Sequence, residues 1–143
     1  MKYREMEISD YGKIISLWQE AGGVKLRKAD SLEGIEKYLK RNPGLSFVAE
    51  KNGEILGTIM SGHDGKRGYI QHLAVETSHR ETGIASKLLS HCLGALKKEG
   101  ILKSHIHVLS NNELAKKYWQ NRGWVKRQDI EVYSYINGGE ENT

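Results

Sequence analysis

The sequence has 143 residues, a size typical of one compact domain with a substantial buried core. Its formal net charge is +4, but the 22 Lys and Arg residues are spread among 18 acidic residues rather than gathered in one stripe, which disfavours nucleic-acid binding. A single cysteine, no apolar run near the roughly 18 residues of a membrane span and a charged opening without a signal-peptide region indicate a soluble, cytoplasmic protein with no internal disulfide and no membrane partner.

The first third of the chain predicts one strand and two helices. The strand lies near Tyr3–Ile8. Each helix has polar residues that can cap its start and Gly or Pro residues that end it. These signals are Ser9 or Asp10 and Gly22-Gly23 for the first helix, and Asp30 or Ser31 and Asn42-Pro43-Gly44 for the second.

Three strands are predicted next, as an antiparallel meander. They cover Leu45–Glu50, Glu54–Ser61 and Tyr69–Val75. Asn52-Gly53 between the first two favours a type I′ hairpin turn, and His63-Asp64-Gly65 is a similar turn signal before the third.

The rest of the chain continues the alternation and gives an α/β domain. A helix runs from Gly83 to Gly100, and a strand follows over Ile101–Leu109. A shorter helix over Asn112–Asn121 and a last strand over Ile130–Ile136 complete the pattern, and the polar tail 137–143 is expected to be disordered.

The turn that joins the Tyr69–Val75 strand to the next helix is suited to an anion. The first turn of a helix has free backbone N–H groups and the positive end of the helix dipole, and Gly83 with the small Ala85 lets a phosphate approach closely. The segment has neither the Gly-Lys-Ser/Thr ending of a nucleotide P-loop nor the Gly-x-Gly-x-x-Gly of a dinucleotide site. A phosphate-bearing cofactor other than ATP or NAD is therefore indicated.

Two blocks of this sequence resemble the GNAT superfamily of acyl-CoA-dependent N-acyltransferases. Arg80, Gly83 and Ala85 stand at the three defined positions of its Gln/Arg-x-x-Gly-x-Gly/Ala motif. The block Asn112–Trp124 is similar to its later helix and turn. The resemblance implies a single domain over residues 1–136, with a mixed, mostly antiparallel sheet of six to seven strands and about four flanking helices. Members of the superfamily also pair as homodimers through their last strands, which this sequence leaves open.

The resemblance further implies acetyl-CoA as cosubstrate and assigns residues to it. Backbone N–H groups of the turn would hold the pyrophosphate, the strand before the turn would pair with the pantetheine arm, and the Asn112 side chain would add a contact to that arm. The arm would enter where the strands Tyr69–Val75 and Ile101–Leu109 separate. The residues implied are Leu73, Ala74, Val75, Arg80, Glu81, Thr82, Gly83, Ile84, Ala85, Ser86, Asn112 and Trp119.

An N-acetyltransferase also needs a group that accepts the proton of the attacking amine. In the superfamily members that acetylate protein N-termini, a Glu base occupies the position that is His107 here, and a neutral imidazole can do the same work. His72 on the neighbouring strand is the second candidate. Alternatively, His105 and His107 lie on one partly solvated face of a strand and have no catalytic role.

The superfamily's general acid is a tyrosine seven residues after Asn112, and that position is Trp119 here. An indole N–H cannot act as an acid near neutral pH. Tyr118 is adjacent, but successive helix positions point about 100° apart. We therefore expect the thiolate to leave without a protein acid, or to take its proton from water, while Trp119 packs against the cofactor.

The predicted activity is acetyl transfer from acetyl-CoA to a primary amine on a small molecule or a peptide. Trp119 leaves open an alternative, a GNAT-fold protein that binds acyl-CoA as a sensor or scaffold without turnover. A third reading is a basic adaptor for nucleic acid. No metal is predicted, because the six His residues and one Cys lack the spacing of common zinc sites.

Overall fold

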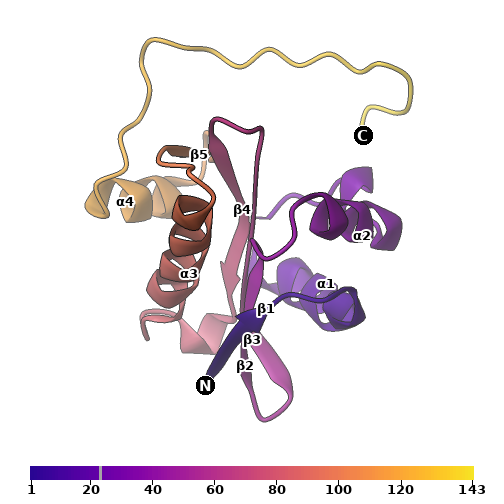
Figure 1. The fold of residues 1–143 in the computed structure, drawn as a ribbon, viewed down its shortest axis with the longest axis vertical. Coiled ribbons are helices and arrows are strands. Elements are labelled where there is room, and N and C mark those ends of the chain that lie inside the picture. Colours follow the sequence, from indigo (N-terminus) through magenta and orange to yellow (C-terminus); the bar gives the residue numbers. More distant parts are fainter. Residues whose placement is uncertain (23) are drawn as a thin grey trace. The chain divides into compact units, whose positions relative to one another are not determined.

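The computed structural model describes residues 1–22 and 24–143, which form two compact units, Met1–His107 and Val108–Thr143. Figure 1 labels the strands and the α-helices. The described part of the first unit contains five strands, three α-helices and three short 3-10 helices. In chain order these are β1 (Lys2–Glu5), η1 (Ile8–Asp10), α1 (Tyr11–Ala21), η2 (Lys28–Asp30), α2 (Leu32–Arg41), β2 (Phe47–Lys51), β3 (Glu54–His63), β4 (Gly68–Val75), η3 (Thr77–His79), α3 (Ile84–Lys98) and β5 (Ser104–Ile106).

The five strands form one sheet in the order β1-β2-β3-β4-β5. Strands β1 to β4 are antiparallel neighbours, whereas β5 runs parallel to β4 because α3 carries the chain back across the sheet. The predicted meander and its mostly antiparallel character are therefore confirmed.

Helices cover both faces of this sheet, with α1 and α2 on one face and α3 on the other (Figure 1). The core beneath α1 and α2 includes Ile14, Trp18, Val48 and Met60, which are at most 3% exposed. On the α3 face, Gly57 permits a close approach, because a Cβ atom there would lie 2.8 Å from the Ile84 side chain. Apolar residues that alternate along the strands thus supply the inner surfaces of two layers.

Several residues that mark helix ends or turns in the sequence adopt the predicted local structure. The Ser31 hydroxyl caps α2 by accepting the Gly34 N–H at 3.1 Å. Asn52 and Gly53 have φ angles of 52° and 77°, as a type I′ turn requires. Gly22 follows α1 with a φ of 71°, and Gly23, the other half of the predicted stop signal, lies outside the described residues.

The strand predicted over Ile101–Leu109 is much shorter in the structure, where β5 spans Ser104–Ile106. The start of the predicted strand, at Ile101, instead takes part in the hydrogen bonds that end α3. Gly100 adopts a φ of 82°, its N–H donates to the Lys97 carbonyl, and the Ile101 N–H donates to the Leu96 carbonyl. This is a Schellman motif with a buried apolar residue after the glycine, and it removes Ile101 from the sheet.

The second unit contains α4 (Glu113–Asn121), which confirms the last predicted helix. The strand predicted over Ile130–Ile136 is wrong, because this segment has no strand in the structure. Its alternating apolar residues have high β-propensity but are exposed and pair with no strand among the described residues, and propensity alone does not form a strand. Within residues 1–22 and 24–143, the sheet consequently has five strands rather than six or seven, and there are four α-helices, as predicted.

Candidate functional site

Strand β4 has an open edge beside β5. The parallel ladder joins Gly68–Ile70 to Ser104–Ile106, and then β5 ends. Over its last five residues, Gln71–Val75, β4 pairs with β3 alone within the described chain. Of the residues predicted to bind the pantetheine arm, Ala74 is buried, while Leu73 and Val75 are half-buried. The resemblance implied that the two strands separate at this edge; in the structure β5 ends after Ile106 and leaves this part of β4 without a partner on that side among the described residues.

The turn after β4 is ordered by Glu76. Its carboxylate accepts hydrogen bonds from His79 Nδ1 at 2.6 Å and from the Ser78 hydroxyl at 2.5 Å. These two bonds, the His79 bond first, lower the pKa of Glu76 to about 2. The ionised side chain therefore holds the 3-10 turn η3, which leads directly into the glycine turn.

Six consecutive backbone N–H groups of the glycine turn, Glu81 to Ser86, find no acceptor among the described residues. The chain can present them together because Glu81 and Gly83 adopt left-handed φ angles of 62° and 90°. The first backbone bond of α3 is donated by Lys87 to the Gly83 carbonyl, at 3.1 Å. A run of free donors at the positive end of a 15-residue helix is an anion-binding arrangement.

Arg80 ties this turn to two other elements of the same unit. Its guanidinium donates from Nη2 to the Ala21 carbonyl at the end of α1, at 2.5 Å, and from Nε to the Val75 carbonyl at 3.4 Å. The Thr82 hydroxyl adds a bond to the His79 carbonyl at 2.5 Å. Arg80 thus places a permanent positive charge at the ends of α1 and β4, in the residue that precedes the free N–H groups.

His72 occupies a β-bulge in β4. Thr58 of β3 lies opposite Ala74 and Met60 lies opposite Gln71, so two β4 residues face one on β3. His72 adopts a φ of 49°, a left-handed conformation that costs a non-glycine residue roughly 1 kcal/mol or more. The bulge turns the His72 side chain toward α1, where the ring packs edge-on against Trp18 with centroids 4.5 Å apart.

The bulge is held in place by two buried hydrogen bonds that meet at Thr58 of β3. Trp18 Nε1 donates to the Thr58 hydroxyl at 2.8 Å, and that hydroxyl donates to the His72 carbonyl at 2.9 Å. Trp18 and Thr58 are at most 1% exposed. The left-handed backbone of His72 is therefore held by groups that water does not reach.

The His72 ring is also held by a carboxylate. Its Nε2 lies 2.6 Å from Asp30 Oδ1, and the side chains of His72 and Asp30 are only 15% and 11% exposed. Burial alone would raise the pKa of Asp30, but hydrogen bonds from His72 and from the Arg27 N–H outweigh burial and lower it. Asp30 is consequently an ionised partner of His72 at neutral pH.

His107, the first candidate base from the sequence, has different surroundings. It follows the end of β5, its side chain is exposed, and it forms no hydrogen bond or ion pair among the described residues. His105 is half-buried, and its ring lies 6.0 Å from the ring of Tyr69. The two histidines that alternate in the sequence are thus unequal in exposure and contacts.

The remaining predicted residues lie in the second unit. The Asn112 side chain caps α4 by accepting the Ala115 N–H at 3.1 Å. Trp119 is buried, with its ring 4.7 Å from that of Trp124. The Tyr118 hydroxyl is buried and has no hydrogen-bond partner among the described residues.

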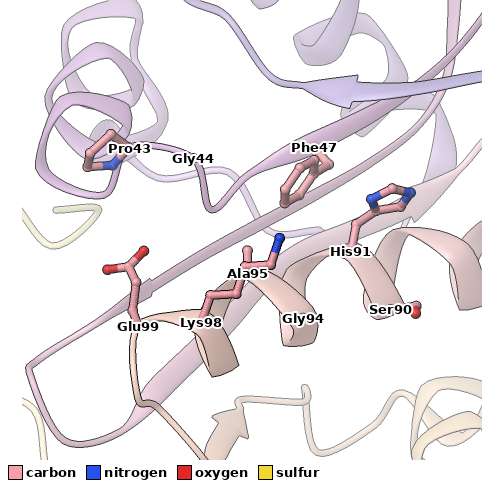
Figure 2. Close-up of a pocket in the computed structure, with 9 residues that line it drawn as sticks. All are labelled: Pro43, Gly44, Phe47, Ser90, His91, Gly94, Ala95, Lys98 and Glu99. Carbon is pink, nitrogen blue, oxygen red and sulfur yellow. The ribbon is translucent and has the colours of Figure 1, made fainter.

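A groove of about 510 Å³ lies elsewhere in the first unit, along the C-terminal half of α3 (Figure 2). It is lined by Pro43, Gly44, Phe47, Ser90, His91, Gly94, Ala95, Lys98 and Glu99. None of the residues predicted to bind acetyl-CoA or to act in catalysis lines this groove.

No helix in residues 1–22 or 24–143 is long and apolar enough to cross a membrane. Over the same ranges, no three or more His, Cys, Asp or Glu side chains are grouped so that they could hold a metal ion.

Sequence reasoning missed the partners of His72. In the sequence, Asp30 stands only as a candidate cap for the second helix, and no pattern links it or Trp18 to His72. Asp30 lies 42 residues before His72, and Thr58 lies 40 residues after Trp18, so these contacts form only when the chain folds. An aspartate between Ala29 and Ser31 carries no local pattern that could have identified it.

Known proteins are similar to this chain in sequence and in fold. The model of the acetyltransferase (GNAT) family matches residues 12–124. An acetyltransferase of Pectobacterium atrosepticum is 34% identical over 113 residues, which are 79% of either chain. Ard1 from Thermoplasma volcanium superposes with a TM-score of 0.77 at 19% identity, covering 87% of this chain and 82% of that one. PaiA N-acetyltransferase from Thermoplasma acidophilum, solved with coenzyme A, superposes with a TM-score of 0.74 at 19% identity, covering 85% and 87%.

Proposed function

Because this chain belongs to the GNAT family of acetyltransferases, we propose that it transfers an acetyl group from acetyl-CoA to a primary amine. Acetyl-CoA is the acetyl donor of this family, and a neighbour in fold was solved with coenzyme A. The acceptor is a small molecule or a peptide that carries the amine. A cytoplasmic location and a single domain over residues 1–136 remain predictions.

The observation that carries this proposal is the run of free backbone N–H groups in the glycine turn beside an open strand edge. Glu81 to Ser86 supply six donors for a pyrophosphate, and Arg80 adds a positive charge. The free part of β4, Gln71–Val75, can pair through its backbone with the amide groups of a pantetheine arm. These features support acetyl-CoA binding with the thioester beside the bulge at His72.

We assign the role of general base to His72. The amine nitrogen attacks the thioester carbonyl carbon and forms the C–N bond, the C–S bond breaks, and the amine proton passes to the imidazole. A strand N–H of β4 stabilises the oxyanion. His72 is favoured because two ring contacts hold it in one orientation, whereas the alternative, His107, is exposed and without such contacts.

For the departing thiolate we propose protonation by water rather than by a side chain. A thiolate with a reference pKa near 8.5 is a tolerable leaving group. Trp119 at the family's acid position supplies no titratable proton, and we propose that it packs against the cofactor while Asn112 contacts the pantetheine arm.

The proposal is tested by incubating the protein with acetyl-CoA and a panel of primary amines and measuring free thiol and the mass of each acceptor. Free thiol is measured with a thiol-reactive reagent. Burial raises the pKa of the thiol of Cys92, the only cysteine in the sequence, to about 12, so this thiol stays protonated and should not react with the reagent in the native protein. Thiol release matched by acceptor mass gain supports the proposal. Binding of acetyl-CoA without transfer to any amine would favour the sensor, and indifference to CoA with salt-sensitive DNA or RNA binding would favour the nucleic-acid adaptor.

A further inference from the structure

Asp30 makes use of both of its carboxylate oxygens. Oδ1 lies 2.6 Å from His72 Nε2, and Oδ2 accepts the backbone N–H of Arg27 at 2.8 Å. The Asp30 carbonyl accepts the Tyr11 hydroxyl at 2.8 Å. Next in the chain, Ser31 caps α2. The backbone of Asp30 is therefore held on both sides, and its carboxylate cannot turn away from His72 without also losing the Arg27 N–H bond.

The pairing determines which ring nitrogen of His72 carries the proton. An ionised carboxylate only accepts hydrogen bonds, so the proton shared with Asp30 belongs to Nε2. In a neutral imidazole the other nitrogen then has a free lone pair. Nδ1 of His72 has no hydrogen-bond partner among the described residues, so it is the nitrogen free to accept a proton.

We propose that Asp30 is a positioning residue, which fixes His72 in the tautomer with its proton on Nε2 so that Nδ1 accepts the proton of the attacking amine. This inference rests on the proposed acetyl transfer with His72 as base. When Nδ1 takes the amine proton the ring becomes an imidazolium, and the Asp30 charge stabilises it without being protonated itself. Asp30 thus acts through His72 and touches neither substrate.

The competing explanation is that Asp30 only anchors the loop before α2 to the sheet. Asp30→Asn separates the two roles, because an amide oxygen can still accept the Arg27 N–H while the amide nitrogen donates to His72 Nε2. The proton of a neutral His72 is then forced onto Nδ1, and the base is blocked. A purely anchoring role needs only the hydrogen bonds, whichever atom donates.

The first readout is the ¹⁵N NMR spectrum of His72 in the free protein, measured where the ring is neutral. We expect the Nε2–H tautomer in the wild type and the Nδ1–H tautomer in Asp30→Asn. The second readout is steady-state kinetics, in which we expect Asp30→Asn to lower kcat about a hundredfold or more with an unchanged KM for acetyl-CoA. Asp30→Glu, which restores a carboxylate, should return the Nε2–H tautomer and part of the rate.

A matched control is available at His63, whose Nε2 lies 2.9 Å from Glu99 Oε1 away from the proposed site. Glu99→Gln makes the same carboxylate-to-amide change and should leave kcat unchanged. An Nδ1–H tautomer of His72 in the wild type, or an Asp30→Asn protein with the wild-type rate, would overturn the role of Asp30. A wild type that has the Nε2–H tautomer but acetylates no amine would instead contradict the proposed function, so the two failures are distinguishable.

Discussion

Thr58 shows how one side chain can fix the geometry of a site that it does not enter. It is fully buried, and its hydroxyl accepts the Trp18 indole N–H and donates to the His72 carbonyl. Both partners would be left with unmet hydrogen bonds in a dry interior if the hydroxyl were lost. The left-handed backbone of His72 therefore depends on a residue of the neighbouring strand.

Thr58→Val keeps the shape of the side chain and removes this hydroxyl. We expect it to lower the free energy of unfolding by about 2 kcal/mol, because two buried polar groups lose their partners, and to lower kcat because the bulge relaxes. Urea unfolding and steady-state kinetics measure the two effects. Thr58→Ser, which retains the hydroxyl, should keep most of the rate, and equal losses of rate in both variants would contradict this role.

The Tyr118 hydroxyl is buried without a hydrogen-bond partner among the described residues. If water protonates the thiolate, Tyr118→Phe removes an unsatisfied polar group, and we expect an unchanged kcat with an equal or higher thermal midpoint. A fall of a hundredfold or more in kcat would show instead that this hydroxyl is the general acid. Pre-steady-state measurement of thiol release gives the sharpest comparison.

At the scale of elements, a partly buried ion network joins the start of the chain to the sheet. Arg4 of β1 binds the Asp10 carboxylate with both guanidinium nitrogens, at 2.8 and 2.9 Å, and also binds Glu50 of β2 at 3.0 Å. Burial alone would raise the pKa of Asp10, but the bonds from Arg4 and the Glu7 N–H outweigh it and lower the pKa. The network holds β1, η1 and β2 together at the edge of the sheet.

A carboxylate whose pKa is lowered by folding stabilises the fold above its unfolded pKa, and this contribution is lost as the pH falls through the folded value. We therefore expect Asp10→Asn to lower the free energy of unfolding at pH 7, and the difference from wild type to shrink toward about pH 3. Urea titrations at several pH values measure this. Glu36→Gln, at an exposed pair with Lys40, is the control and should have no effect, while a difference for Asp10→Asn that does not change with pH would contradict the account.

The helices, turns and most strands can be predicted from local sequence signals, whereas the contacts between these elements cannot. Ser31, Asn52-Gly53 and the Gly83 turn each specify their structure within a few residues, so the sequence is enough to find them. The prediction of a strand over Ile130–Ile136 is wrong, because a strand needs a pairing partner that its own residues do not specify. For the same reason the glycine turn could be predicted from the sequence, whereas the pairing of Asp30 with His72 could not.

At the scale of the molecule, the first unit alone contains the glycine turn, the open β4 edge and the His72–Asp30 pair. Acetyl-CoA binding by these features is the central claim. A negative charge placed in the first turn of α3 tests this claim. Gly83→Glu would add such a charge but would also strain the backbone, because Gly83 has a φ of 90°. Ser86→Glu adds that charge where the helix dipole favours it, and Ser90→Glu repeats the change one turn later as a control.

The most direct measurement is the thermal midpoint of the wild type, Ser86→Glu and Ser90→Glu, each with and without acetyl-CoA. A ligand at a hundred times its Kd stabilises a protein by about 2.7 kcal/mol, which is several degrees for a domain of this size. We predict such a shift in the wild type and in Ser90→Glu, and its loss in Ser86→Glu. No shift in the wild type, or equal shifts in all three proteins, would contradict acetyl-CoA binding at the glycine turn.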